Sequence, residues 1–338
     1  MNEKNMIEVH NLTKTFTAYK KGKGLAGTIK SLFKREAIHI EAVKDISFDI
    51  KPGEIIGYIG ANGAGKSTTI KMMTGILNPT SGYVKVGDYI PYEKRQENAK
   101  HIGVVFGQKT QLWWDLPVGE TFAILKEIYQ VPDDFYASQM AYFDEIFELS
   151  EFMGQTVRTL SLGQRMRADL AASMLHNPKV LFLDEPTIGL DVMVKERIRK
   201  AIKDMNQRYG TTILLTTHDM SDIEELCHRI IIIDKGKLLY DGGIDTIRKE
   251  FGYERKIVFD LRYDDTVMVE QTLETLIPSV DGCQPDNTSY QLSEGQLTVN
   301  FNRNQVGVSG IMNFVLSHFN VLDFSVQDMD IEAIVKRF

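Results

Sequence analysis

Three short, mainly apolar stretches of the chain lack the polar alternation of a half-exposed strand. They cover residues 54–59, 179–183 and 212–216, and each leads into glycine or polar residues. Strands buried on both faces of a parallel sheet typically have this pattern. Functional loops of such sheets lie at the carboxyl ends of the strands. The pattern therefore predicts an α/β domain whose site follows these three strands.

The pattern changes after about residue 243. Two later stretches, 257–262 and 297–302, place apolar residues at every second position, as half-exposed strands do. Helical stripes lie after them, at Ile311, Phe314 and Val315 and at Ile331, Ile334, Val335 and Phe338. We therefore predict a first domain over 1–245 and a small α+β domain over 252–338. A ferredoxin-like sandwich is one option for the second domain.

Composition fits two ordinary globular domains in a chain of 338 residues, with 43% hydrophobic and 25% charged residues. The two cysteines, Cys227 and Cys283, stand apart from any Cys/His cluster, which indicates a reducing compartment and no zinc site. The net charge of -7 argues against binding to nucleic acid. No apolar run approaches the roughly 20 residues that span a bilayer. If the protein acts in transport, we expect another chain to form the pathway.

A glycine-rich segment, Gly60-Ala61-Asn62-Gly63-Ala64-Gly65-Lys66-Ser67, lies between a predicted strand and a predicted helix. Its spacing is that of a P-loop, in which backbone N–H groups and the start of the helix bind phosphates. In this pattern Lys66 bridges the β- and γ-phosphates of ATP, and Ser67 is a ligand of Mg²⁺. A strand-to-helix turn with a chance lysine is the alternative, which the context disfavours. The predicted phosphate cradle consists of Gly60, Asn62, Gly63, Ala64, Gly65, Lys66, Ser67 and Thr68.

Two acids follow the second apolar stretch. Asp184 closes the strand, where P-loop enzymes place a carboxylate that holds Mg²⁺. Neighbouring residues at a strand end point in different directions, so Glu185 can face an attacking water as general base. His218 follows the third stretch and can donate to the γ-phosphate, although a lone histidine is more often structural.

Further segments resemble the motifs of the ATP-binding-cassette (ABC) nucleotide-binding subunits. Five elements follow the P-loop in that family's order: Val105-Phe106-Gly107-Gln108 (Q-loop), Leu160-Ser161-Leu162-Gly163-Gln164 (signature), Val180–Glu185 (Walker B), Ile188-Gly189-Leu190-Asp191 (D-loop) and Thr217-His218-Asp219 (switch histidine). The resemblance covers roughly residues 6–243. It implies an ABC cassette fold with a mixed sheet and a helical subdomain near 115–160.

The resemblance also implies a composite site made by two cassettes packed head to tail. Each ATP then lies between the P-loop of one copy and Ser161, Gly163 and Gln164 of the other, while Asp191 crosses the interface. Gln108 joins Ser67 and Asp184 around Mg²⁺, and Phe16 stacks on adenine, with Tyr19 as a second choice. The implied catalytic residues are Lys66, Gln108, Glu185 and His218.

By this resemblance the chain is the ATPase subunit of an ABC transporter, of the single-cassette exporter type. It would work at the cytoplasmic face of the plasma membrane, bound to a separate multispanning permease. A homodimer is expected and a heterodimer is allowed. The alternative, a soluble cassette protein acting on nucleic acid or ribosomes, fits less well because the chain is acidic and has one cassette. A kinase or GTPase leaves the signature and His218 unexplained.

Three features depart from the family pattern or extend it. Leu162 stands where the signature usually has glycine, which puts local flexibility or close packing in question. Residues 17–38 form a predicted insertion with a basic amphipathic stripe; it either lies on an anionic membrane or the permease, or packs on its own domain. Trp113 and Trp114, directly after the Q-loop, either bind a permease helix or support the helical subdomain.

Overall fold

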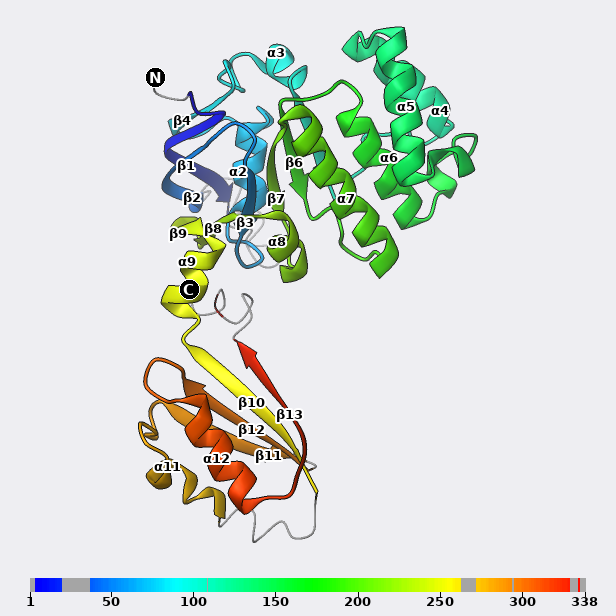
Figure 1. Ribbon diagram of the computed structural model, residues 1–338. Coiled ribbons are helices and arrows are strands. Elements are labelled where there is room, and N and C mark those ends of the chain that lie inside the picture. The colour runs from blue at the N-terminus through cyan, green and yellow to red at the C-terminus, as the bar shows by residue number, and fades with distance from the viewer. Residues whose placement is uncertain are drawn as a thin grey trace, which may run out of the picture. The chain divides into compact units, whose positions relative to one another are not determined.

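The chain folds into two compact units, Met1–Gly242 and Gly243–Phe338 (Figure 1). The computed structural model describes residues 4–19, 37–107, 109–262, 272–293, 295–328 and 334. Gln108, most of the predicted insertion 17–38 and most of the last apolar stripe lie outside these residues. Of the insertion, residues 17–19 and 37–38 are described, and they pair as ordinary strand residues.

The first unit is built on a six-stranded sheet with the order β5-β6-β7-β3-β8-β9. The strands are β3 (Ile55–Ile59), β5 (Ile102–Phe106), β6 (Val180–Asp184), β7 (Thr212–Thr216), β8 (Arg229–Asp234) and β9 (Lys237–Gly243). Strands β5 to β8 pair in parallel. The turn from β8 to β9 has positive φ at Lys235 and Gly236, as a tight antiparallel hairpin requires. The sheet is therefore mixed.

A smaller antiparallel sheet, β2-β1-β4, packs on the same core. It consists of β1 (Ile7–Tyr19), β2 (Ala37–Ile50) and β4 (Ser81–Val86). Helix α2 (Lys66–Met73) lies between the two sheets (Figure 1), and its Ile70, Met72 and Met73 share one buried cluster with residues of both. The short helix α3 (Arg95–Ala99) precedes β5.

Helices occupy the other side of the six-stranded sheet (Figure 1). They are α4 (Val118–Tyr129), α5 (Asp133–Phe147), α6 (Leu162–Met174), α7 (Val192–Tyr209) and α8 (Met220–Leu226), with 3₁₀ turns at Leu149–Glu151 and Val157–Thr159. Of these, α4 and α5 lie beyond α6 and α7, farther from the sheet (Figure 1). Their Phe122, Phe143 and Phe147 are fully buried. The region 115–160 thus holds α4 and α5.

The second unit follows the order β-α-β-β-α-β after a leading helix. Its elements are α9 (Ile244–Phe251), β10 (Glu254–Leu261), α11 (Leu276–Ser279), β11 (Thr288–Ser293), β12 (Gln296–Asn302), α12 (Val308–His318) and β13 (Val321–Asp328). The strands form an antiparallel sheet, β11-β12-β10-β13, with its own apolar core. Ferredoxin-like sandwiches have this element order.

Candidate functional site

The glycine-rich loop 60–65 connects β3 to α2 through two positions that admit only glycine. Gly65 has φ of 112°, and a Cβ there would lie 2.5 Å from the Ala42 carbonyl oxygen. A Cβ at Gly60 would lie 2.2 Å from the carbonyl oxygen of Ile233. The first backbone N–H groups of α2 have no acceptor within the helix, so they are open to an anion.

Lys66 begins α2 and turns its side chain back over this loop. Its ammonium donates to the carbonyls of Gly60 at 2.6 Å and Ala61 at 3.2 Å. Burial lowers the pKa of Lys66, while the carboxylates of Glu185 and Asp184 act in the opposite direction. The side chain therefore lies where its charge can reach both the loop and the two acids.

Asp184, at the end of β6, is joined to the loop and to β7. The hydroxyl of Ser67 donates to its Oδ2 at 3.0 Å, and that of Thr216 donates to its Oδ1 at 2.6 Å. A hydroxyl oxygen beside a carboxylate is a donor set that suits Mg²⁺, which commonly uses one or two protein ligands together with phosphates and water. The residues present therefore fit this ion.

Glu185 adopts a positive φ of 56° and contacts His218, which follows β7. The Nε2 of His218 lies 2.9 Å from Oε1 of Glu185. The backbone N–H of Glu185 donates to the Thr216 carbonyl at 2.9 Å, which fixes the turn. A non-glycine residue in this conformation is uncommon and is concentrated at functional sites.

A cavity of about 370 Å³ brings Ser67, Asp184 and Glu185 together. Its described lining combines residues of the P-loop helix, the end of β5 and the end of β6: Ser67, Lys71, Ile76, Phe106, Gly107, Lys109, Asp184 and Glu185. None of the predicted signature residues is in that described lining. The P-loop helix and the two acids thus meet within one chain, whereas the predicted signature residues lie outside this described lining.

The predicted signature forms the exposed start of α6. Ser161 is its N-cap: its hydroxyl accepts from the N–H of Gln164 at 3.2 Å, and the Gln164 side chain accepts from the N–H of Ser161 at 2.9 Å. Such a reciprocal capping box fixes the helix start. Gly163 has room for a side chain, because a Cβ there would meet only Val194 at 3.8 Å.

Two other predicted residues lie away from the cavity lining. Asp191 caps α7, where its Oδ1 accepts from the N–H of Val194 at 3.0 Å. Phe16 lies on β1 opposite Ile40, with 38% of its surface exposed and the Lys14 ammonium 5.3 Å from the ring centroid. The exposed ring of Phe16 is therefore available for stacking on a base.

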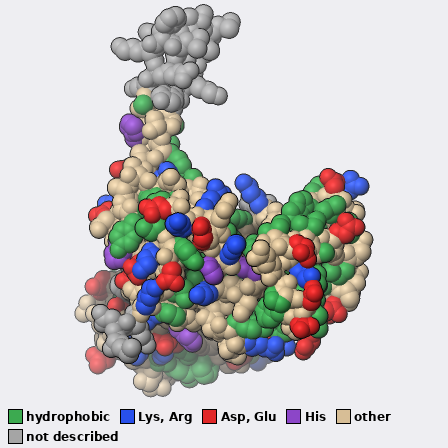
Figure 2. Space-filling view, turned by 90° about the horizontal axis from the view of Figure 1, so that it is seen from above, with side chains coloured by type: hydrophobic (Ala, Val, Ile, Leu, Met, Phe, Trp, Pro, Cys, Tyr) green, Lys and Arg blue, Asp and Glu red, His purple; other side chains and the backbone are tan. Residues whose placement is uncertain are grey.

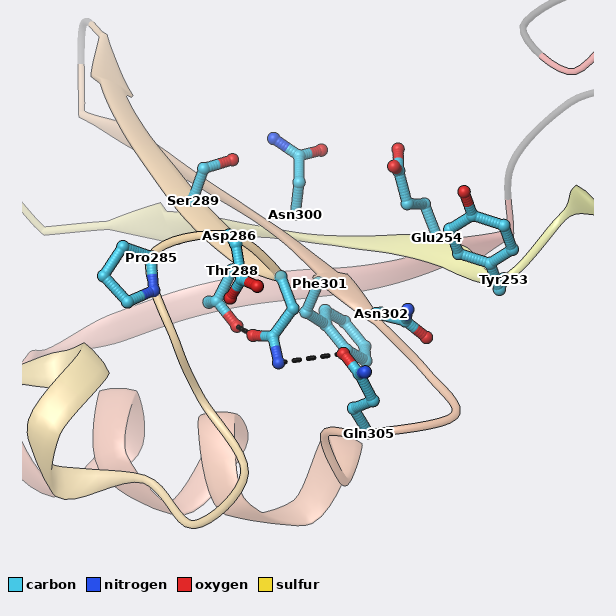
Figure 3. A pocket seen from close by; sticks show the side chains of 11 residues that line it. Tyr253, Glu254, Pro285, Asp286, Thr288, Ser289, Asn300, Phe301, Asn302 and Gln305 are labelled. Carbon is cyan, nitrogen blue, oxygen red and sulfur yellow. Dashed lines mark hydrogen bonds between the residues drawn. The ribbon is translucent and has the colours of Figure 1, made fainter. Parts of the chain in front are cut away.

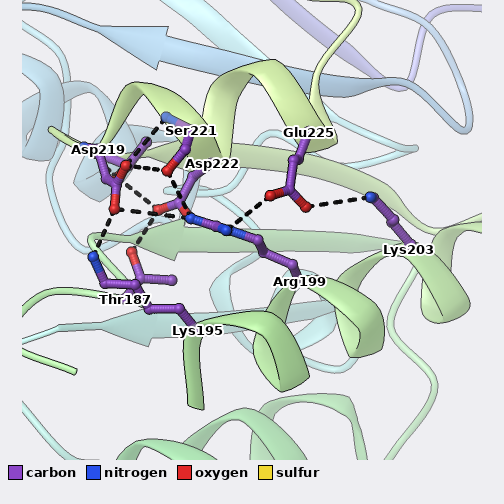
Figure 4. Close-up of polar contacts among 9 residues, drawn as sticks. Thr187, Lys195, Arg199, Lys203, Asp219, Ser221, Asp222 and Glu225 are labelled. Carbon is purple, nitrogen blue, oxygen red and sulfur yellow. Dashed lines mark hydrogen bonds and ion pairs between the residues drawn. The ribbon is translucent and has the colours of Figure 1, made fainter. Parts of the chain in front are cut away.

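A buried charge network, which the sequence reasoning missed, supports the loops that carry Glu185 and His218 (Figure 4). Its centre is Asp222 on α8, fully buried, which accepts from the hydroxyls of Thr187 at 2.5 Å and Thr217 at 2.9 Å. Arg199 of α7 donates to the other carboxylate oxygen at 2.7 Å. One aspartate thus links the segment after Glu185 to the residue before His218.

A second missed residue is Asp169 on α6. Its carboxylate accepts from the Thr110 hydroxyl at 2.9 Å and the Gln111 N–H at 3.0 Å. Burial raises the pKa of Asp169 to about 6, against the effect of these hydrogen bonds. The contact attaches the segment after the predicted Q-loop to the helix that the signature begins.

Taken together, the loop, Asp184 and the buried sheet define a P-loop nucleotide-binding protein. Residues 43–188 match the ABC transporter family. The chain is 30% identical to the ABC transporter ATP-binding protein NatA of Bacillus subtilis over 66% of its length and 89% of that protein. It is 34% identical to the linearmycin resistance ATP-binding protein LnrL of the same organism, over 64% of this chain and 68% of LnrL.

A solved structure has the same fold. The dimeric, post-hydrolysis structure of the ATP-binding cassette MJ0796 with ADP and Pi is 27% identical, with a TM-score of 0.58 over 71% of this chain and 99% of that one. The chain therefore belongs to the ABC transporter family. It is the ATP-binding subunit of a transporter and an ATPase, as the sequence motifs predict.

Proposed function

We propose that this cassette hydrolyses ATP with the residues that meet at its P-loop. Lys66 and the N–H groups at the start of α2 hold the β- and γ-phosphates, Glu185 takes a proton from the attacking water, and His218 orients Glu185 and the γ-phosphate. The observation that carries this proposal is the convergence of Ser67, Asp184, Glu185 and His218 from three separate strand ends.

Mg²⁺ would be held by Ser67 and Asp184, with Gln108 as the further ligand that the family resemblance implies. Bound there, the ion would neutralise charge on the phosphates. Thr216 donates to Asp184 at 2.6 Å and thereby keeps the other carboxylate oxygen directed at Ser67.

We further propose that two copies close head to tail over two ATP molecules. Around the start of α6 and α7 lies a group of exposed apolar side chains, with exposures of 38% to 69%: Leu162, Ile188, Val192 and Met193. Exposed apolar side chains are typical of protein interfaces, and the start of a helix can bind an anion. This surface therefore fits a protein interface that contains a phosphate. The similar MJ0796 cassette is dimeric in its ADP- and Pi-bound structure, which supports a dimer of this chain.

Mixing two inactive variants tests the shared site. Lys66→Ala removes the phosphate-binding cation, and Gly163→Asp places a negative charge at the signature, where the Cβ has room. Each variant alone should lose nearly all turnover. In a mixture of equal parts, heterodimers contain one intact site, so about a quarter of wild-type turnover should return. A mixture as inactive as its components would refute the head-to-tail site.

Glu185→Gln separates binding from hydrolysis. This variant keeps the shape of the side chain but cannot accept the proton, so it should bind ATP and stop turning over. The ATP-bound dimer should then accumulate, as measured by light scattering after gel filtration. Wild-type turnover in this variant would remove Glu185 from the reaction.

The subunit is proposed to act at the cytoplasmic face of the plasma membrane, on a separate permease and in the outward direction. No helix within the described ranges is long and apolar enough to cross a membrane. The name of LnrL, a resistance protein, supports export. Trp113 and Trp114 are 40% and 49% exposed, and the adjoining lobe of α4 and α5 carries surface hydrophobic side chains (Figure 2). Aromatic anchors of this kind are typical of interfaces.

The tryptophans can be tested by co-expressing this chain with a candidate multispanning permease. Replacing both with alanine should reduce copurification with that protein and leave the basal ATPase unchanged. Replacing Tyr209, which is 38% exposed on α7, is the matched control. Undiminished copurification of the double variant would place the permease contact elsewhere.

A further inference from the structure

Strand β13 is an edge of the sheet in the second unit. The order β11-β12-β10-β13 places no other strand of the described residues on its outer side. An edge strand presents a row of backbone donors and acceptors, which proteins usually protect with charged residues, proline, a β-bulge or a very short strand. Strand β13 has eight residues and contains neither lysine nor proline; its protection is limited to Asp323, Asp328 and a register shift near its start.

The same strand exposes three large apolar side chains. Leu322, Phe324 and Val326 are 67%, 44% and 43% exposed. Cross-strand partners share a face of the sheet, and here they are the fully buried Phe259 opposite Phe324 and Ile257 opposite Val326. Phe324 and Val326 therefore continue the core face, and the described helices leave them uncovered. Leu322 lies at the register shift between Asp323 and Val321 and extends the exposed apolar stripe along the strand.

The opposite face of the sheet is polar. In Figure 3, Ser289, Asn300 and Glu254 project from the side away from the helices, around a cavity of about 520 Å³. The stripe on β13 is thus not an ordinary solvent-facing surface of a half-exposed sheet. Its composition instead matches the interior of a sandwich.

We propose that β13 pairs with β13 of a second copy of this chain, antiparallel and centred on Phe324. In this register Phe324 faces the partner's Phe324, and Leu322 faces the partner's Val326. On the polar face, Asp323 faces the partner's Ser325. The strand is therefore complementary to itself under a two-fold axis, as an isologous interface requires.

The two neighbouring registers that still place Leu322, Phe324 and Val326 on one face of the joined sheet are less favourable. A shift by one step in one direction places Asp323 opposite the partner's Asp323, and like charges opposite each other destabilise a strand pair. A shift in the other direction places Leu322 opposite the partner's Asp328. Both registers lose an apolar contact or add repulsion, so the centre at Phe324 is preferred.

The backbone of β13 also fits this pairing. The N–H of Phe324 donates to Oδ1 of its neighbour Asp323 at 2.8 Å. The acceptor is the exposed Asp323 side chain, which can rotate into water and leave this N–H free to pair with another strand. In the paired strands the two Phe324 residues then exchange both N–H···O=C bonds across the two-fold axis.

The self-complementarity selects a second copy as the occupant rather than an unrelated peptide or a lipid surface. The pairing requires no nucleotide and does not depend on the ATP site. Two cassettes tethered in this way would have a raised effective concentration for each other.

Cysteine cross-linking tests the register. Directly paired Cα atoms in such a hydrogen-bonded pair lie about 5.5 Å apart, within the range of a disulfide. In a Cys283→Ser background, Phe324→Cys should form a disulfide-linked dimer on mild oxidation without nucleotide. Leu322→Cys or Val326→Cys alone should not, because identical residues then lie about 14 Å apart along the strands. A mixture of these two variants should cross-link.

A second experiment measures the dimer itself. The full-length chain without nucleotide should be dimeric in light scattering, and Leu322→Lys with Val326→Lys should make it monomeric by placing lysines against each other. Gln327→Lys, on the polar face, is the matched control and should stay dimeric. Adding Glu185→Gln and ATP should restore a dimer in the lysine variant, because the cassette contact is separate.

Two results would overturn the proposal: a wild-type chain that is monomeric without nucleotide, or a Phe324→Cys variant that cross-links no more than Leu322→Cys. Neither result bears on the ATP site. Loss of the Glu185→Gln dimer in ATP, with the nucleotide-free dimer retained, would instead count against the head-to-tail cassette pair alone.

Discussion

Replacing Arg199 with methionine should destabilise the cassette severely. Arg199 is 8% exposed, and its guanidinium is the charged partner of the fully buried Asp222. Methionine keeps the apolar stem but leaves a buried carboxylate with only two hydroxyl donors. Removing one partner of a buried pair costs about 3–5 kcal/mol. That is a large share of the stability of a typical domain.

Urea unfolding followed by tryptophan fluorescence can measure this cost. Both tryptophans of the chain, Trp113 and Trp114, lie in the first unit, so the signal reports on the cassette. The matched control is Arg197→Met. Arg197 lies two positions earlier on α7 and pairs with the partly exposed Glu148. Because exposed pairs contribute little, this control should cost about 1 kcal/mol or less.

A double variant checks the cause. If the loss in Arg199→Met comes from the unpaired carboxylate, adding Asp222→Asn should recover about 1–3 kcal/mol, since a neutral amide is cheaper to bury than a charge. A loss below about 1 kcal/mol in the single variant, or a double variant as unstable as the sum of the two single variants, would refute the reasoning.

Three further predictions concern the site. Lys66→Ala should lower kcat of ATP hydrolysis by at least about 100-fold, because it removes charge stabilisation of the transferring phosphoryl group; near-normal turnover in a steady-state assay would contradict this. Burial raises the pKa of Asp169 to about 6 from 3.8, so the folded state binds this proton more tightly than the unfolded state. The free energy of unfolding should therefore fall by about 3 kcal/mol as the pH rises from about 4 to 6. Asp169→Asn should remove that slope in urea titrations. In the Glu185→Gln background, Leu162→Ala and Leu162→Gly should weaken the ATP-bound dimer equally, because both remove the contacts of the exposed leucine side chain. A defect in the alanine variant alone would instead indicate that this position needs backbone flexibility.

The parts of the candidate site that depend on residues adjacent in the sequence could be predicted from local sequence patterns. The P-loop could be predicted because Gly60 and Gly65 are imposed by backbone contacts at 2.2 and 2.5 Å, and such positions tolerate no other residue. The buried strands could be predicted because strands covered on both faces need unbroken apolar runs. The position of Asp184 follows from both, since it ends one of those strands.

The supporting network could not be predicted in the same way. Asp222 and Arg199 are on different helices, and their pairing depends on how α7 packs against α8. A lone aspartate after the switch histidine reads as a solvated helix residue, although its exposure is zero. Likewise, the alternation in 321–326 is that of an ordinary half-exposed strand, and only the sheet order identifies it as an edge.

The network links the loops that carry Glu185 and His218 to helices α7 and α8. Thr187 follows Glu185 by two positions, Thr217 precedes His218, and both donate to the same buried carboxylate. A displacement of α8 relative to α7 would therefore move both loops together rather than one at a time. The Glu185–His218 contact at 2.9 Å consequently depends on a charge pair outside the cavity. Rigid support of this kind explains how a glutamate with positive φ can be held in place.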